Sequence, residues 1–177
     1  MGLIERILGR RPPVPEVMRQ HVSADERVLA WARSTSGQIV ATTQLGMHIL
    51  GRDGHRMIGW HQISKGVWRD GVLAVTESAE VDDQQIADKE PWSLQFTEPG
   101  NVPVVLRERV EQSIVAARYC RISSGSVWLI GRKIPGQNGL HWQYRPDPEV
   151  DPHDLQTHAE IAQLIQLERT AHEPEDF

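Results

Sequence analysis

One stretch of the chain, residues 92–117, reads WSLQFTEPGNVPVVLRERVEQSIVAA and changes its apolar period midway. Its first six residues alternate between apolar and polar, which is the period of a β-strand. After the Pro-Gly pair, apolar residues recur at spacings of three and four, which is the period of an amphipathic helix. These residues are Val102, Leu106, Val110, Ile114 and Ala117. The stretch therefore predicts a strand followed directly by a helix over 102–117, with Val110 and Ile114 buried.

The chain before this stretch repeats the two-residue period of strands. Two turn signals, Gly51-Arg52-Asp53-Gly54 and Asp70-Gly71, stand between alternating runs, and glycine readily takes the positive φ that tight hairpin turns require. The runs lie at residues 28–33, 39–43, 47–50, 58–63, 67–69 and 72–76. Residues 78–91 are polar and acidic, so we expect a mobile surface loop there. The pattern predicts an antiparallel meander of about six strands, to which residues 92–97 add a seventh.

The chain after this stretch predicts a second hairpin and a last helix. Residues 126–133 and 140–145 alternate in polarity on either side of Gln137-Asn138-Gly139. Asp151 and Pro152 are typical of the start of a helix, and apolar residues then recur at helical spacing over 152–170. We expect residues 119–170 to form a β-β-α extension packed on the preceding domain, and residues 171–177 to fray.

Composition excludes several classes of protein. The chain has 177 residues, 39% of them hydrophobic, and a net charge of −5, which is typical of a soluble globular protein with one domain or one domain and an appendage. No apolar run approaches the roughly 20 residues of a transmembrane helix. We expect no nucleic-acid binding from so acidic a chain, because phosphates attract basic surfaces. Cys120 is the single cysteine, which excludes an intrachain disulfide and fits a cytoplasmic location.

Residues 24–118 carry an order that resembles bacterial pleckstrin-homology-like (PH-like) domains. The run 24–31 leads into the first strand, 40–46 passes into the third, and 60–63 closes the fourth. The resemblance implies an α+β, mainly β fold: a seven-stranded antiparallel barrel or roll over residues 20–118, capped by a helix. The hairpin and C-terminal helix that follow are similar to an extension in actinobacterial proteins of this type. Such folds bind phosphoinositides, peptides or partner domains, and the resemblance implies no reaction.

The sequence contains no pattern that indicates catalysis. A Gly-x-Ser-x-Gly elbow, a P-loop and a dinucleotide fingerprint are all missing, and the eight histidines have no metal-ligand spacing. We therefore expect no enzyme activity, no cofactor and no metal site. The leading hypothesis is a binding or assembly module whose partner is another protein or a second copy. Two alternatives stay open, namely a peripheral membrane adaptor and a small enzyme of an unrecognised class.

Two groups of residues are candidates for contact with a ligand or partner. Basic residues around the third to fifth strands could bind a ligand: Arg52, Arg56, Lys65 and Arg69. The first hairpin, at residues 34–38, carries no cation, which argues against the binding of a lipid headgroup. The second group belongs to the N-terminal segment, residues 1–19, which is amphipathic, basic and then Pro-rich. Its aliphatic residues could contact a membrane surface or a partner: Leu3, Ile4, Ile7 and Leu8.

Overall fold

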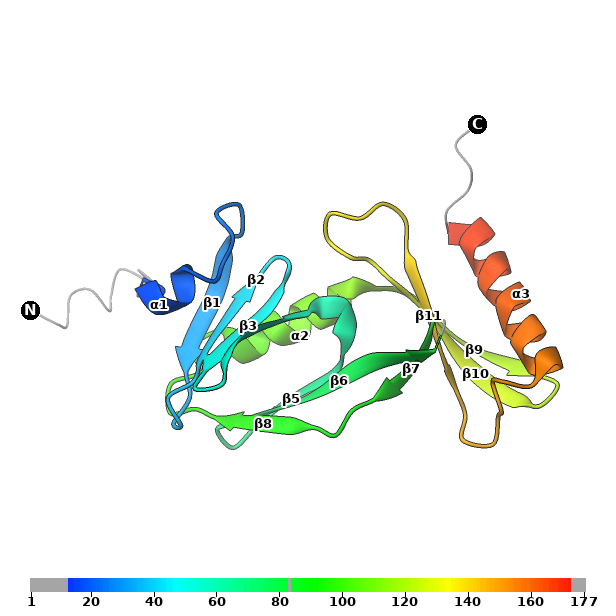
Figure 1. Cartoon of the computed structure of the whole chain (residues 1–177), viewed down its shortest axis with the longest axis horizontal. Helices are drawn as coiled ribbons and strands as arrows, with labels where there is room; N and C mark the ends of the chain where they lie inside the picture. The colour runs from blue at the N-terminus through cyan, green and yellow to red at the C-terminus, as the bar shows by residue number, and fades with distance from the viewer. Residues whose placement is uncertain (1–12, 83, 173–177) are drawn as a thin grey trace, which may run out of the picture.

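The first sheet is a meander of four antiparallel strands in chain order (Figure 1). This computed structural model describes residues 13–82 and 84–172. The strands are β1 (Val28–Arg33), β2 (Ile39–Thr43), β3 (Gly46–Gly51) and β4 (Gly54–Gly59). Gly54 has a φ of +105°, which glycine adopts freely, so the predicted turn between β3 and β4 is confirmed. The short helix α1 (Glu16–Arg19) buries Met18 against the outer side of this sheet.

The second sheet curls like a half-barrel and runs the length of the molecule (Figure 1). A single turn of 3-10 helix, η1 (Trp60–Gln62), leads into it. Its strands are β5 (Ile63–Arg69), β6 (Val72–Asp82), β7 (Gln85–Asp88), β8 (Trp92–Gln95), β9 (Ile114–Ile122), β10 (Gly125–Arg132) and β11 (His141–Pro146). The first half of β6 pairs with β5 and β8, and its second half pairs with β7, which lies parallel to β11. β6 and β7 therefore join two lobes.

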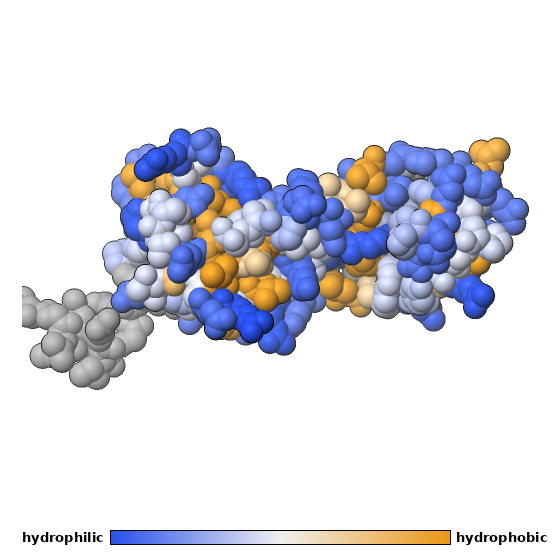
Figure 2. All heavy atoms as spheres, turned by 90° about the horizontal axis from the view of Figure 1, so that it is seen from below, coloured by the Kyte–Doolittle hydropathy of each residue, from blue (hydrophilic) through white to orange (hydrophobic). Residues whose placement is uncertain are grey.

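Each lobe has a hydrophobic core of its own. Helix α2 (Val102–Ser113) fills the first lobe, where its apolar side chains pack among residues of β1 to β6 and β8. Helix α3 (Leu155–His172) covers one face of β9, β10 and β11, with Ile161 and Ile165 buried against Leu129 and Trp142. The molecule is elongated, and apolar residues on its lower face lie in separate patches among hydrophilic ones (Figure 2).

The expectation of a mainly β protein with a helix after the strands and a C-terminal helix is confirmed, but the strand count is wrong. The described residues, 13–82 and 84–172, contain eleven strands. β7 and the second half of β6 replace the surface loop expected at residues 78–91. Pairing of backbone groups between β6 and β7 holds these strands, whereas most of their side chains are polar, so hydrophobic periodicity gave no signal.

The predicted helix over 102–117 is four residues too long. Ser113 ends α2, and its hydroxyl donates a hydrogen bond to the carbonyl of Val110 at 2.7 Å. Ile114 then begins β9 and is 38% exposed, so the prediction that Ile114 is buried is wrong, whereas Val110 is buried as predicted. The β-branched pair Ile114-Val115 favours the strand. The predicted domain boundary between residues 118 and 119 consequently falls inside β9.

Gly66 allows α2 to approach β5 closely, which gives a first prediction. A methyl group at Gly66 would lie 2.1 Å from Cδ2 of Leu106, a side chain buried in the first core. We expect Gly66→Ala to lower the free energy of unfolding by about 2 kcal/mol through overpacking. Urea denaturation measures this loss. In the double variant with Leu106→Val the two losses should be less than additive, and strict additivity would contradict the close contact.

Candidate functional site

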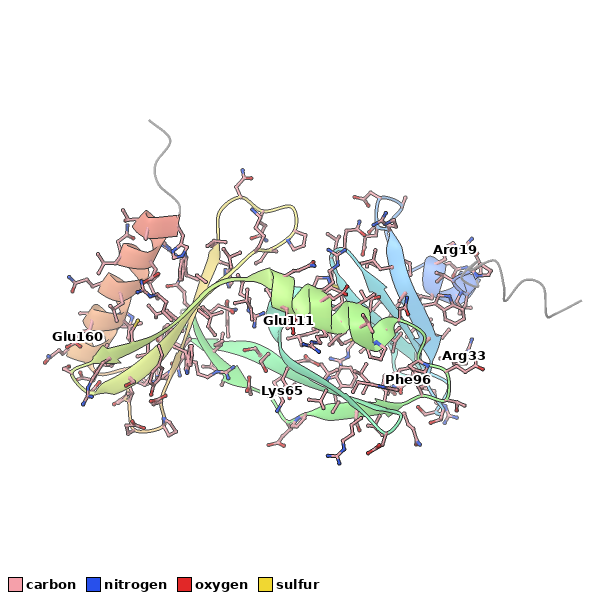
Figure 3. The ribbon with its side chains drawn as sticks, turned by 180° about the vertical axis from the view of Figure 1, so that it is seen from behind. Arg19, Arg33, Lys65, Phe96, Glu111 and Glu160 are labelled. Carbon is pink, nitrogen blue, oxygen red and sulfur yellow. The ribbon has the colours of Figure 1, made fainter. Side chains whose placement is uncertain are left out.

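The four basic residues predicted to bind a ligand do not form one site. Arg56 lies on β4, where its Nη1 donates to Glu77 Oε1 at 2.6 Å and its guanidinium stacks over the ring of Trp92. Arg52 lies in the β3–β4 turn and lines a different hollow. Lys65 projects from β5 (Figure 3), and Arg69 pairs with its exposed neighbour Asp70. Arg56 already shares a carboxylate, so an anion site built from all four finds no support in their positions.

The aliphatic candidates Leu3, Ile4, Ile7 and Leu8 lie outside the described residues. The part of their segment that is described ends in α1, which packs on the first sheet. No helix within residues 13–82 and 84–172 is long and apolar enough to cross a membrane. Within the same ranges, no group of three or more histidine, cysteine, aspartate or glutamate side chains is placed to hold a metal ion.

A first candidate site is the free edge of β9 with the side chains beside it. β9 is the last strand of the second sheet, and no other strand of the described chain pairs with its outer edge. Tyr119 on β9 and Trp128 opposite it on β10 are exposed on the sheet face away from α3, with ring centroids 5.1 Å apart. Val115 is exposed on the same face. We call Val115, Ala117, Tyr119, Trp128 and the adjoining edge the β9 surface.

Hairpin geometry determines which backbone groups point out of this edge. Ile122 pairs with Gly125 across a two-residue turn, and the pair closing such a turn exchanges both of its hydrogen bonds. Alternation along an antiparallel strand then directs the N–H and C=O of residues 116, 118 and 120 to β10. Those of residues 117, 119 and 121 point outward, and the alternation ends at Val115, where a bulge pairs Ile114 rather than Val115 with Arg132. This row is the kind of template on which another strand can pair.

Helix α3 adds an apolar row beside the same edge. Glu160 accepts hydrogen bonds from the backbone and hydroxyl of Ser123 at the end of β9 (Figure 3). His172 lies across the helix, with its ring against Trp142 of β11. Leu164, Leu167 and Ala171 follow Glu160 at spacings of four, seven and eleven, so they share its side of the helix. Leu167 is 60% exposed there. The β9 surface therefore continues onto α3.

A second candidate site is a pocket of about 590 Å³ where the two lobes meet. Its walls come from β4, η1, β6, the segment after β7, the β10–β11 loop and β11. We call it the junction pocket. Glu77 lines one part of the junction pocket and accepts hydrogen bonds from Arg56, Trp92 and Lys89. Burial raises the pKa of Glu77, but these donors outweigh burial and hold the pKa below its usual range.

Glu80 carries the charge in another part of the junction pocket. It accepts hydrogen bonds from His141 Nε2 at 2.5 Å and from Gln143 Nε2 at 3.5 Å. Burial raises the pKa of Glu80, and these hydrogen bonds more than offset it, so the net direction is downward. Burial, with the charges of His141 and Arg132, lowers the pKa of His61, whose ring faces that of His141. His61 is therefore uncharged at neutral pH.

A row of titratable side chains lies at the other end of the first lobe. His48 is buried between Glu26, 2.9 Å from its Nε2, and His55, 3.0 Å from its Nδ1. The ring of His55 stacks on that of His21, which follows α1. The four residues come from three separate regions of the chain, so their spacing in sequence gave no sign that they meet.

Comparison with known proteins adds no relative. No family model matches the chain, and no curated protein matches it significantly. The function is therefore inferred from the geometry of these sites.

Proposed function

We propose that this protein is a non-catalytic binding module of the PH-like type that assembles with a second copy of itself through the β9 surface. The PH-like interpretation is supported by the four-stranded meander, the three strands β5, β6 and β8, and a helix between the two layers. The proposal for assembly depends on a single observation. β9 is a nine-residue edge strand whose outer edge has no partner strand within residues 13–82 and 84–172.

Edges of this length are usually protected in monomers by lysine, proline, a bulge or a covering segment. β9 reads IVAARYCRI, without lysine or proline, and its bulge at Val115 leaves residues 116–122 in regular pairing with β10. Arg118 does not protect the edge, because its Nη1 donates to Glu168 Oε1 of α3 at 2.7 Å. Exposed Tyr119 and Trp128 are of the residue types enriched in binding hot spots. Strand pairing would satisfy the outward N–H and C=O groups. It would also bury the surface around the rings of Tyr119 and Trp128.

A second copy fits this edge because antiparallel pairing of two identical strands has two-fold symmetry. A register centred on Ala117 pairs residues 116–118 of the two copies and brings Tyr119 next to the bulge at Val115 of the other copy. The same register sets Arg118 opposite Ala116 rather than opposite a second Arg118. The rows of Leu164 and Leu167 on the two α3 helices would then face each other across the axis.

The test is the molar mass of the full chain in solution, measured by light scattering after size exclusion. We expect a dimer. Ala117→Pro removes an outward N–H and leaves the residues bonded to β10 unchanged, so it should yield a monomer with an unaltered circular dichroism spectrum. Val104→Lys, on the exposed side of α2, is the matched control and should stay dimeric. A monomeric wild type, or a dimeric Ala117→Pro, would overturn the proposal.

The register can be tested separately by disulfide trapping. In a Cys120→Ser background, Ala117→Cys places two thiols next to the two-fold axis and should cross-link rapidly under mild oxidation. Val104→Cys in the same background should not. Failure of Ala117→Cys to cross-link in a protein that is dimeric would reject this register while leaving the dimer itself in place.

A further inference from the structure

The junction pocket has the size and the polarity of a ligand site. Its volume of about 590 Å³ lies in the range of pockets for small molecules. Apolar wall segments come from Ile58 and Ile134. Ser78 and Gln143 also line the pocket, and Gln143 is only 3% exposed. Ser78 Oγ and Gln143 Oε1 have no hydrogen-bond partner among the described residues. A buried polar group without a partner costs stability, so a ligand that supplies one would be favoured.

The pocket is also dipolar. On one side Arg56 and Lys89 share the single carboxylate of Glu77, which leaves a net charge of +1. On the other side Glu80 accepts hydrogen bonds from His141 and from the neutral amide of Gln143, and no lysine or arginine of the described residues forms an ion pair with it. That side therefore presents a carboxylate without a lysine or arginine partner. Glu77 and Glu80 are three residues apart on β6, so at most about 10 Å of strand separates them.

Charges of opposite sign at this separation select a ligand with an ammonium at one end and a carboxylate at the other. Three extended residues span about 10 Å, which is the upper limit of this separation. The peptide groups between the ends could donate to Gln143 Oε1 and hydrogen-bond to the hydroxyl of Ser78. Phosphate-type anions fit less well, because Glu77 already neutralises part of the positive side.

We propose that the junction pocket binds a short linear peptide of about three residues, with its amino terminus at Glu80 and its carboxyl terminus at Arg56 and Lys89. This inference does not depend on the β9 surface, which lies on the second lobe's outer edge. The Ala117→Pro variant should therefore bind the same peptide as well as the wild type does.

Isothermal titration calorimetry of the full chain with trialanine at about pH 8 tests the proposal. We expect binding by the wild type and a loss of roughly tenfold or more in affinity for Glu80→Gln and for Lys89→Met. Trialanine with an acetylated amino terminus and an amidated carboxyl terminus should not bind. Glu111→Gln, an exposed carboxylate on α2 (Figure 3), is the control and should bind normally.

Three outcomes would overturn the proposal: no heat with trialanine, equal affinity for the capped peptide, or unchanged affinity in both pocket variants. The capped peptide is tested on the wild type, so the proposal stays falsifiable even if a variant folds poorly.

Discussion

Replacing Arg132 by alanine is expected to lower the free energy of unfolding by about 3 kcal/mol. Arg132 lies on β10, is 2% exposed, and reaches into the first lobe. Its Nη1 donates to Ser113 Oγ at 2.7 Å and its Nη2 to the carbonyl of Ile63 at 3.2 Å. Alanine would remove two charge-assisted hydrogen bonds and leave a cavity between the lobes. Burial and the neighbouring charge of Arg145 lower the pKa of Arg132 to about 10, so the guanidinium is still charged at neutral pH.

The position of this charge explains why a buried cation is tolerated there. The last turn of α2 reads Val-Glu-Gln-Ser, and a helix C-terminus favours a cation that its own residues do not supply here. Arg132 supplies it from the other lobe. Urea denaturation measures the loss. The control is Arg33→Ala at the exposed end of β1 (Figure 3), which should stay within about 0.5 kcal/mol of the wild type. A loss of that small size for Arg132→Ala would mean that the lobes do not depend on this residue.

Arg132→Met separates the lost volume from the lost charge. Methionine fills most of the space of the arginine stem, and removing a desolvated charge offsets part of the lost hydrogen bonding. We therefore expect a smaller loss than for alanine. A loss equal to that of alanine would assign the stabilisation to the hydrogen bonds rather than to packing.

The fold could be predicted from sequence wherever burial determines which residues are apolar. Apolar residues recur at strand or helix period in the meander, α3 and the 126–145 hairpin, and most of these residues are buried. β7 and the end of β6 are held by backbone pairing between polar strands, so no periodic signal marks them. At Ile114 the apolar spacing of α2 continues by coincidence into β9, and only tertiary packing ends the helix.

The candidate sites could be predicted far less well. Arg56 was a candidate because it is basic, but Glu77, which is 21 positions away, already pairs with it. Glu80 and His141 are 61 positions apart and meet only through the parallel contact of β7 with β11. Pairing between distant strands has no local pattern in sequence. An exposed edge such as that of β9 likewise depends on which strand the chain leaves unpaired.

The second large expected effect concerns the row of titratable side chains in the first lobe, which consists of Glu26, His48, His55 and His21. Burial raises the pKa of Glu26, but hydrogen bonds from Thr43 and His48 outweigh it, so Glu26 is ionised at neutral pH. His48 Nε2–H therefore donates to Glu26, and His48 Nδ1 shares a hydrogen bond with His55 Nε2 at 3.0 Å. The Glu26 side chain is 5% exposed. His48→Leu would leave this buried carboxylate without its imidazole donor, at a cost of about 2 kcal/mol near pH 7.

The pH dependence of this cost has a definite sign. Because the pKa of Glu26 is lower in the folded protein, its contribution to stability is complete above the unfolded value of 4.5 and is lost as pH falls through the folded value. In His48→Leu the buried carboxylate would instead gain a proton on acidification and lose its penalty. The stability difference between wild type and variant should therefore shrink toward acid pH.

His55 adds a second window at milder acidity. Burial and the charges of His21 and His48 lower the pKa of His55, so the unfolded chain binds this proton more readily than the folded protein does. The wild type should lose stability as pH falls below about 6.5. His55→Gln keeps a hydrogen-bond partner for His48 Nδ1 and does not titrate, so it should flatten this window. The exposed His158→Leu on α3 is the control. Urea denaturation of the four proteins from about pH 8 to about pH 4 measures both effects. If the free energy of unfolding of wild type, His48→Leu and His55→Gln changed in parallel with pH, the row would not couple protonation to folding.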